Sequence, residues 1–291
     1  SKFHKDNRVG YFPSVSAGWN VHQEKWFQNP VMSKLKIRAS YGELGANFLN
    51  PYNFDAIAYG PIPYTVGGER YVTGRAAYLK SKDLKWETAK TTDIGIELGF
   101  FNNDLTLSLD YFVKKNVDLL AQIDLNLSSG QIFEINSSRE KPYVNTASVK
   151  NTGWEFMMNY RKQLTKDFHI DATFNIATLK NKVLSLGENV QPITSGAMSS
   201  YFNDAPSITM PGEAIGSFYG YKIDGFDAEG NFIFADMDKN GVVNANDKVI
   251  LGSPIPDFTY GLNINMEYKD FDLTLFFQGV QGNDIFNQKK Y

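Results

Sequence analysis

A run of oxygen-bearing side chains between positions 236 and 247 has the composition of a cation-binding loop. Oxygen ligands occur at its first, third, fifth and twelfth positions, the seventh offers its backbone carbonyl, and the sixth is a glycine. This spacing can wrap oxygen atoms around a hard cation, while the glycine permits a sharp reversal of the chain. The sequence therefore predicts a metal site whose ligands are Asp236, Asp238, Asn240, Val242 and Asp247.

The expected ion is Ca2+ in a structural role. A flexible cage made entirely of protein oxygens suits Ca2+ better than Mg2+, which gives up its water shell reluctantly. The twelfth position carries Asp247 in place of the bidentate glutamate of an EF-hand, and no helices are predicted on either side, so the loop resembles the dockerin-type variant. The alternative is a turn without an ion, because Asp, Asn and Gly favour turns in any case.

The predicted ion loop is followed by a corner with two prolines and then by a strand. Residues 248–252 lead to Pro254 and Pro256, after which residues 258–267 alternate between apolar and polar side chains. Strict alternation predicts a strand with one apolar and one polar face. The loop is thus expected to be built directly onto a hairpin of a larger sheet.

Alternating segments recur along the chain in pairs that are joined by short turns. The high aromatic content of 14% and the 24 scattered glycines also favour an all-β chain. We predict four antiparallel hairpins, near residues 14–44, 92–112, 153–176 and 258–278. Between them the alternation disappears, and we predict long loops at 45–91, 114–150 and 178–257.

The contrast between short turns on one side and long loops on the other indicates an antiparallel transmembrane β-barrel. Strands of about nine to eleven residues can cross a hydrocarbon layer at a barrel tilt. A soluble sandwich or barrel is the alternative for any single hairpin, because the signal per segment is weak. A water-filled lumen tolerates the polar face that is formed by Asp93, Glu97, Asp110, Glu155, Asp171, Asn175, Asn263, Asn265, Glu267 and Asp272.

The composition limits the classes of function. The net charge of -3 and the pI near 5.7 give no argument for a nucleic-acid partner. The absence of cysteine removes disulfides, thiolate metal sites and cysteine nucleophiles. No apolar run approaches the roughly 18 to 20 residues of a membrane-spanning helix. The polar start at residues 1–6 has no signal-peptide character, so we expect either a protein that is not exported or a chain that begins after the exported N-terminus.

The sequence predicts no enzyme. His4, His22 and His169 are the histidines of the chain, and no two of them have a metal-ligand spacing. There is no Gly-x-Ser-x-Gly motif and no phosphate loop. Carboxylate pairs for glycoside hydrolysis meet only in space, but carboxylates on strand faces are explained more simply as the lining of a lumen.

Several motifs together resemble one family, the SusC/RagA-type TonB-dependent outer-membrane transporters. They follow one another along essentially the whole chain, which makes the set more specific than any single piece. The motifs lie at Ser1–Phe3, Arg8–Trp19, Lys36–Gly42, Leu84–Glu87, Thr91–Gly95, Asn151–Glu155, Gly216–Lys222, Asp236–Asp247, Pro256–Leu262 and Phe276–Gly279.

The resemblance implies a fold and a set of partners. Members of the family carry a plug inside a 22-strand barrel, a TonB-contacting segment near the N-terminus and a SusD-like surface lipoprotein as a lid. We expect this chain to be a later, barrel-forming part without plug or final strand, located in the outer membrane of a Gram-negative bacterium. The imported substrate would be an oligosaccharide or an oligopeptide, and the residues do not decide between them.

Another class of function also fits the residues alone. A secreted, Ca2+-stabilised β-rich module that binds glycans or mediates adhesion would share the ion loop and the strands but would need no lipid. If the chain is a barrel, the strand directions place residues 178–257 on the extracellular side and residues 268–270 at a periplasmic turn. The ion would then stiffen an external loop where a lipoprotein lid docks.

Overall fold

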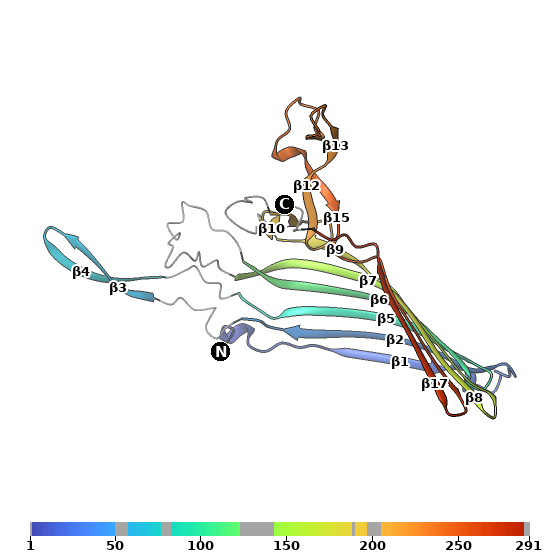
Figure 1. Cartoon of the computed structure of the whole chain (residues 1–291). Coiled ribbons are helices and arrows are strands. Elements are labelled where there is room, and N and C mark those ends of the chain that lie inside the picture. The colour runs from blue at the N-terminus through green and yellow to red at the C-terminus, as the bar shows by residue number, and fades with distance from the viewer. Residues whose placement is uncertain are drawn as a thin grey trace.

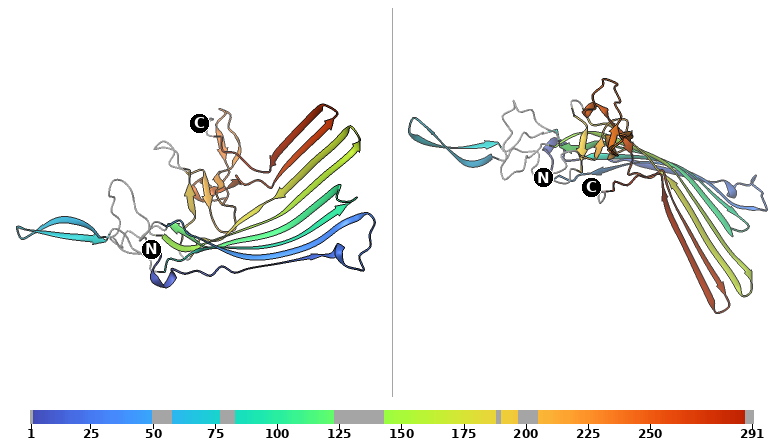
Figure 2. Two further views of the ribbon diagram at one scale, coloured as in Figure 1. Left: turned by 90° about the horizontal axis from the view of Figure 1, so that it is seen from below. Right: turned by 45° about the horizontal axis from the view of Figure 1, so that its top comes forward.

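The computed structural model describes residues 2–49, 58–76, 83–122, 143–187, 190–196 and 205–287. Its largest feature is an antiparallel sheet, called the wall below, that curves across its width (Figures 1 and 2). The strand order is β1-β2-β5-β6-β7-β8-β16-β17, and β9 pairs with residues 148–152 of β7. The predicted all-β antiparallel fold is confirmed, and within the described residues the sheet is open at β1 and β17.

The wall strands are joined by short connections at one end. Phe101, Asn102 and Asn103 have φ values of 54°, 58° and 67°, and Lys269 has a φ of 55°, so these turns use the left-handed region of backbone space. The wall consists of β1 (Ser14–Asn20), β2 (Met32–Ala46), β5 (Glu87–Phe100), β6 (Leu105–Gln122), β7 (Tyr143–Thr165), β8 (Phe168–Thr178), β9 (Lys180–Ser185), β16 (Phe258–Tyr268) and β17 (Phe271–Gln281).

Several wall strands extend beyond the predicted hairpins. The interval 114–150 was expected to be a loop, but β6 continues to Gln122 and β7 already begins at Tyr143. Two irregularities between Asn116 and Leu120 interrupt the pairing without ending it. Backbone pairing thus carries the two strands past the point where side-chain alternation is lost, and this part of the prediction was wrong.

The predicted long loops contain strands of their own. Residues 45–91 include the hairpin of β3 (Ala58–Val66) and β4 (Glu69–Ala76). Residues 178–257 include a small sheet and a separate hairpin, both at the opposite end of the wall from the short turns (Figure 1). Their strands are β10 (Ile193–Ser195), β11 (Ser207–Thr209), β12 (Ser217–Tyr221), β13 (Ile223–Phe226), β14 (Phe232–Phe234) and β15 (Lys248–Gly252).

The two faces of the wall differ in chemistry. One row across it reads Gly18, Arg38, Gly95, Asp110 and Glu155, each directly opposite the next. The neighbouring positions point to the other face, where large apolar side chains are exposed. Examples of these exposed residues are Ile37, Ile94, Leu109, Trp154 and Leu273.

Buried apolar clusters are small and lie at the long-connection end of the wall. Ala147 and Val149 of β7 pack with Val183 of β9 and with Leu186. A second cluster joins Phe3, Leu49 and Leu84. The described helices are short 3-10 turns, η1 (Lys5–Asn7), η2 (Val21–Gln23) and η4 (Ala245–Asp247). None of the helices in the described ranges has the length and apolarity needed to cross a membrane.

Candidate functional site

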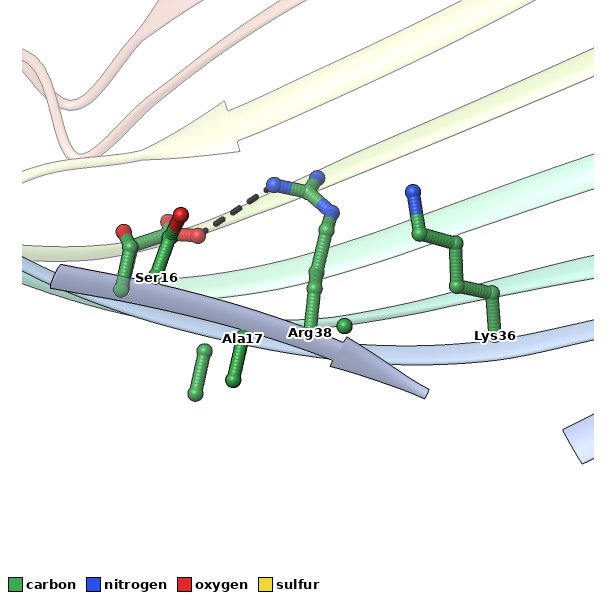
Figure 3. Close-up of a pocket in the computed structure, with 8 residues that line it drawn as sticks. Ser16, Ala17, Lys36 and Arg38 are labelled. Atoms are coloured by element: carbon green, nitrogen blue, oxygen red, sulfur yellow. Dashed lines mark hydrogen bonds and ion pairs between the residues drawn. The ribbon is translucent and has the colours of Figure 1, made fainter. Parts of the chain in front are cut away.

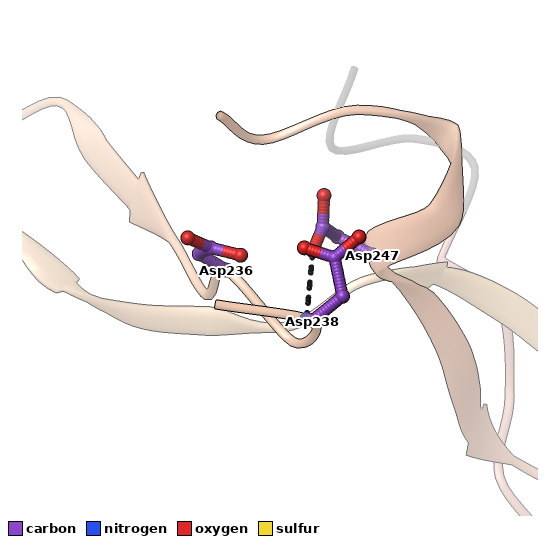
Figure 4. A group of neighbouring side chains, drawn as sticks. All are labelled: Asp236, Asp238 and Asp247. Carbon is purple, nitrogen blue, oxygen red and sulfur yellow. Dashed lines mark hydrogen bonds between the residues drawn. The ribbon is translucent and has the colours of Figure 1, made fainter. Parts of the chain in front are cut away.

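The predicted ligand loop lies between β14 and β15, beside the protruding β13–β14 hairpin (Figure 1). The structure brings the carboxylates of Asp236, Asp238 and Asp247 together, each with an oxygen atom within 4.8 Å of the others (Figure 4). Asp247 ends the 3-10 turn η4 just before β15. Residues nine and eleven positions apart therefore converge on one point, as the spacing predicted.

Asp247 is the organising residue of this loop. Its side chain is fully enclosed and accepts the backbone N–H groups of Met237 at 2.7 Å, Asn244 at 2.7 Å and Asp238 at 3.3 Å. One carboxylate thus ties the beginning of the loop to its end. The Asn244 N–H is the main cause that lowers the pKa of Asp247 below its ordinary value, while burial acts in the opposite direction.

The first half of the loop is a tight turn around the other two carboxylates. Asp236 accepts the N–H of Asn240 at 3.2 Å and that of Gly241 at 2.7 Å. Gly241 has a φ of +88°, a conformation that an L side chain adopts only with strain, and this explains the glycine at the sixth position. Asp238 accepts the side-chain amide of Asn240 at 2.9 Å.

The two remaining predicted ligands take part in turn hydrogen bonds. The side-chain oxygen of Asn240 accepts the N–H of Val242 at 2.8 Å, and the carbonyl of Val242 accepts the side-chain amide of Asn244 at 3.1 Å. Asn244 was not singled out from the sequence. It caps η4 by accepting the N–H of Asn246 at 2.9 Å, and its own N–H is held by Asp247 in a capping box. The motif of a polar residue three positions before an acidic one is the signal that could have revealed it.

A second polar cluster lies on the polar face of the wall and centres on Arg38 of β2. Its guanidinium forms ion pairs with Asp110 at 2.6 Å, Asp93 at 3.3 Å and Glu97 at 3.3 Å. Lys34 also reaches Glu97, at 2.7 Å. The three carboxylates belong to the polar face that the alternation predicted, whereas their convergence on one arginine was not visible in the sequence.

Gly95 makes the contact between Arg38 and Asp110 possible. Arg38 lies on β2 and Asp110 on β6, so their side chains meet above β5, which runs between the two strands. A Cβ atom at position 95 would lie 1.8 Å from Oδ1 of Asp110 and 3.1 Å from Cζ of Arg38. The glycine is therefore required for the close approach of the two side chains and not for an unusual φ.

A hollow of about 270 Å3 adjoins this cluster, between β1 and β2. Lys36 and Arg38 point to one side of the two strands and Ala17 to the other, while Ser16 and Gly18 of β1 leave space beside the charged groups (Figure 3). The lining combines small residues with charged ones, as expected for a face that borders water. Cations and carboxylates are balanced here, so the cluster suits a polar lumen wall better than a site for one charged ligand.

The histidines are dispersed over the described residues. Nδ1 of His4 lies 2.9 Å from Oδ2 of Asp6, and Nδ1 of His22 lies 3.1 Å from the carbonyl oxygen of Leu35. His169 stands opposite Glu267 in the wall. Of the described residues, Asp236, Asp238 and Asp247 form the group of acidic or histidine side chains that could share a metal ion.

Fold and residues together define a class of protein. The family model described as TonB dependent receptor-like, beta-barrel matches residues 1–288, and the chain belongs to this family. Within the family it is of the SusC/RagA type, so the resemblance drawn from the sequence motifs is confirmed. The open sheet is accordingly a section of a β-barrel wall.

Individual relatives agree with this assignment. The TonB-dependent receptor P3 of Formosa agariphila is 35% identical over 99% of this chain, which spans 30% of that protein. The TonB-dependent receptor SusC of Bacteroides thetaiotaomicron is 31% identical over 98% of this chain, and the matched part makes up 29% of SusC. The chain thus covers about a third of the curated relatives that it matches.

A solved structure shows the same fold. The RagAB peptide importer in its open-open state aligns with a TM-score of 0.79 and 22% identity, over 97% of this chain and 30% of that one. The relatives are named as receptors and transporters rather than as enzymes, in keeping with the non-enzymatic interpretation of the sequence.

Proposed function

We propose that this chain forms part of the barrel of an outer-membrane transporter that imports oligosaccharides or oligopeptides with energy from TonB. The observation that carries the proposal is the two-faced wall, with charged residues around Arg38 on one side and exposed apolar residues such as Ile94 and Trp154 on the other. Contact between an apolar face and lipid costs little free energy, whereas contact between the same face and water is unfavourable. Membership of the TonB-dependent receptor-like family supports the same function.

The difference between the two ends of the wall supports an orientation in the membrane. The short turns at 101–104, 166–167 and 269–270 belong to the periplasmic side, and the end with β10 to β15 belongs to the cell exterior. A TonB-contacting segment would lie outside this part of the protein. In this proposal the chain serves as wall and external loop.

A SusD-like lipoprotein is the proposed partner of the external end. The β13–β14 hairpin exposes Phe226 and Phe232 to 65% and 57%, and Met237 and Val242 in the adjoining loop are also exposed. Exposed apolar patches of this kind mark interaction sites. A lid resting on the barrel would cover them.

The acidic loop supports a further part of the proposal, a structural Ca2+ ion bound by Asp236, Asp238 and Asp247 with oxygens from Asn240 and Val242. The closeness of three carboxylates supports it, since negative charges this near one another repel unless a cation lies between them. The ion would hold the base of the β13–β14 hairpin and so present that hairpin to the lid. Mg2+ suits the loop less well, because a site made of protein oxygens requires its dehydration.

Uptake measurements test the transport function directly. A strain that lacks the full-length transporter should lose growth on either a glycan or a peptide mixture, and re-expression should restore it. The substrate that restores growth decides between the two classes. A full-length protein that is monomeric and stable in water without detergent or partner would instead favour a secreted binding module.

Calorimetric titration of Ca2+ into the full-length protein tests the ion site. Binding with one ion per chain at this loop is expected, and anomalous scattering in a crystal should place the ion among the three carboxylates. Absence of binding at millimolar Ca2+ would contradict the site. Removal of Ca2+ with a chelator should weaken retention of the lipoprotein if the ion orders the docking hairpin.

A further inference from the structure

Four lysines form a continuous row across the wall, on the side of its long-connection end. Lys90 of β5 stands directly opposite Lys115 of β6, Lys115 opposite Lys150 of β7, and Lys150 opposite Lys182 of β9. These residues, called the lysine row below, are scattered over more than ninety positions of the sequence, and only the strand register brings them together. Side chains directly opposite each other in antiparallel strands lie about 4.5 to 5.5 Å apart at Cβ.

Among the described residues, the positive charge of the row is largely uncompensated. Glu43 of β2 continues the row beyond Lys90 and forms an ion pair with it at 3.1 Å. None of the ion pairs formed within the described ranges involves Lys115, Lys150 or Lys182. Like charges directly opposite one another destabilise a sheet, so the row needs an anionic partner from outside.

The lysine row lies on the apolar face of the wall and not on the face of the Arg38 cluster. Lys115 lies four residues from Tyr111 on β6, and Lys150 lies four residues from Trp154 on β7. An even spacing along a strand keeps side chains on the same face. The rings of Tyr111 and Trp154 are in contact, with centroids 4.8 Å apart, and Trp154 is 51% exposed. Four residues correspond to about 13 Å along the strand, toward the long-connection end.

This arrangement has the order of groups found at a membrane surface. Apolar side chains come first, an aromatic pair follows, and cationic groups on long flexible stems lie beyond the pair. Aromatic residues prefer the level of the lipid headgroups, and lysines near that level extend toward the polar layer. At the level of the row, the lipid headgroups would therefore supply anionic groups in addition to Glu43.

We propose that the lysine row binds the phosphate groups of a phosphorylated glycolipid in the outer leaflet of the outer membrane. The inference rests on the proposed function, because the orientation of the barrel decides which leaflet the row meets. Spaced side by side, the ammonium groups can engage several phosphates of one glycolipid or of its neighbours. The lipid supplies the negative charge that the wall lacks at this level, and the contact fixes the height of the barrel in the membrane.

The test compares two matched variants of the full-length transporter, each expressed in its native outer membrane. One carries Lys115→Gln, Lys150→Gln and Lys182→Gln. The control carries Lys25→Gln, Lys166→Gln and Lys269→Gln, which removes the same charge at the short-turn end. The proteins are extracted in mild detergent, and the glycolipid and phospholipid that remain bound to each are quantified by mass spectrometry. Heat-dependent migration on a semi-native gel checks that each barrel is folded.

The lysine-row variant should retain far less glycolipid than the wild type, whereas the control variant should retain the wild-type amount. Each basic residue near an anionic surface contributes about a fivefold effect, so the affinity for added glycolipid should fall by about a hundredfold. The loss should be smaller at high ionic strength, where the wild-type contact is itself screened. Removal of the phosphates from the glycolipid should reproduce the effect of the triple substitution.

Four outcomes would overturn the inference. Equal glycolipid retention by the two variants would show that the row does not bind lipid. Competition by equimolar inorganic phosphate would identify a site for free anions, and an acidic protein retained by the row in place of glycolipid would identify a protein interface. A loss of phospholipid instead of glycolipid would place the row in the inner leaflet and refute the proposed orientation. By contrast, retention of glycolipid through the row in a protein that imports neither glycan nor peptide would support the inference and refute only the proposed substrate class.

Discussion

The wall and the segment between residues 205 and 252 are both built from antiparallel strands, but they are held together differently. In the wall, β7 is 23 residues long and pairs with β6 along most of its length. In the segment, β14 has three residues and pairs with β13. The wall therefore spreads its stability over many backbone hydrogen bonds, whereas the segment depends on a few side-chain contacts.

The difference determines how each region responds to a substitution. Cross-strand contacts in a long ladder are individually modest, so the loss of one is shared by its neighbours. In the acidic loop, by contrast, Asp247 alone receives three backbone N–H groups from both ends of the loop. A point substitution in the loop should therefore disrupt the loop strongly but locally. A point substitution in the wall should lower the stability of the wall only moderately.

The largest effect is expected for Asp247→Ala. It leaves three enclosed N–H groups without an acceptor and removes a carboxylate from the proposed ion site, so the loop should lose its order and Ca2+ affinity should fall at least about a hundredfold. Calorimetry with Ca2+ and limited proteolysis of residues 222–247 measure the two effects. Asp224→Ala, which removes an exposed carboxylate of the adjoining β13–β14 hairpin, is the control. Ca2+ binding by the Asp247 variant at wild-type affinity would refute the ion site.

A smaller effect is expected in the wall for Gly95→Ala. The new methyl group would collide with Asp110 and push apart its ion pair with Arg38, at a cost of about 1–3 kcal/mol of stability. Gly42→Ala is the matched control, since a Cβ there meets its nearest neighbour, Cβ of Ser14, at an ordinary 3.6 Å. The temperature at which the full-length barrel unfolds on a semi-native gel distinguishes them. Equal temperatures for both variants would contradict the role given to Gly95.

Removal of the arginine itself should have an effect of similar or smaller size. Arg38→Met keeps an unbranched apolar stem but removes the guanidinium and leaves three carboxylates close together. The side chain of Arg38 is 37% exposed, so solvent screens the group, and we expect a loss of about 1–2 kcal/mol. Chemical denaturation of the detergent-solubilised barrel measures it, with Ser40→Ala on the same face as control. An unchanged midpoint would show that the cluster contributes little to stability.

The smallest effect on the wall is expected for Phe232→Ser. This ring lies on the protruding hairpin and contacts Phe226 and Phe234 rather than any wall strand. The unfolding temperature of the barrel should stay at its wild-type value, whereas retention of the lipoprotein partner should decrease. A lowered unfolding temperature would show that the wall and the hairpin are energetically coupled.

The extent of the strands shows where sequence patterns stop being informative. Alternation indicated residues 92–112 and 153–176, but β6 and β7 run to Gln122 and from Tyr143. Beyond the membrane-facing part, side chains are no longer divided between lipid and water, so the pattern fades while backbone pairing continues. Hairpin β3–β4 likewise lies outside the segments in which alternation was recognised.

The sequence by itself determined the antiparallel strands, the two chemically different faces and the convergence of Asp236, Asp238 and Asp247, because each depends on spacing within one short stretch. Only the tertiary structure decided that Gly95 lies beneath the Arg38–Asp110 contact and that four distant lysines form one row. Those features depend on the register between strands. Register is set by cooperative pairing across the whole sheet, and no single segment contains that information.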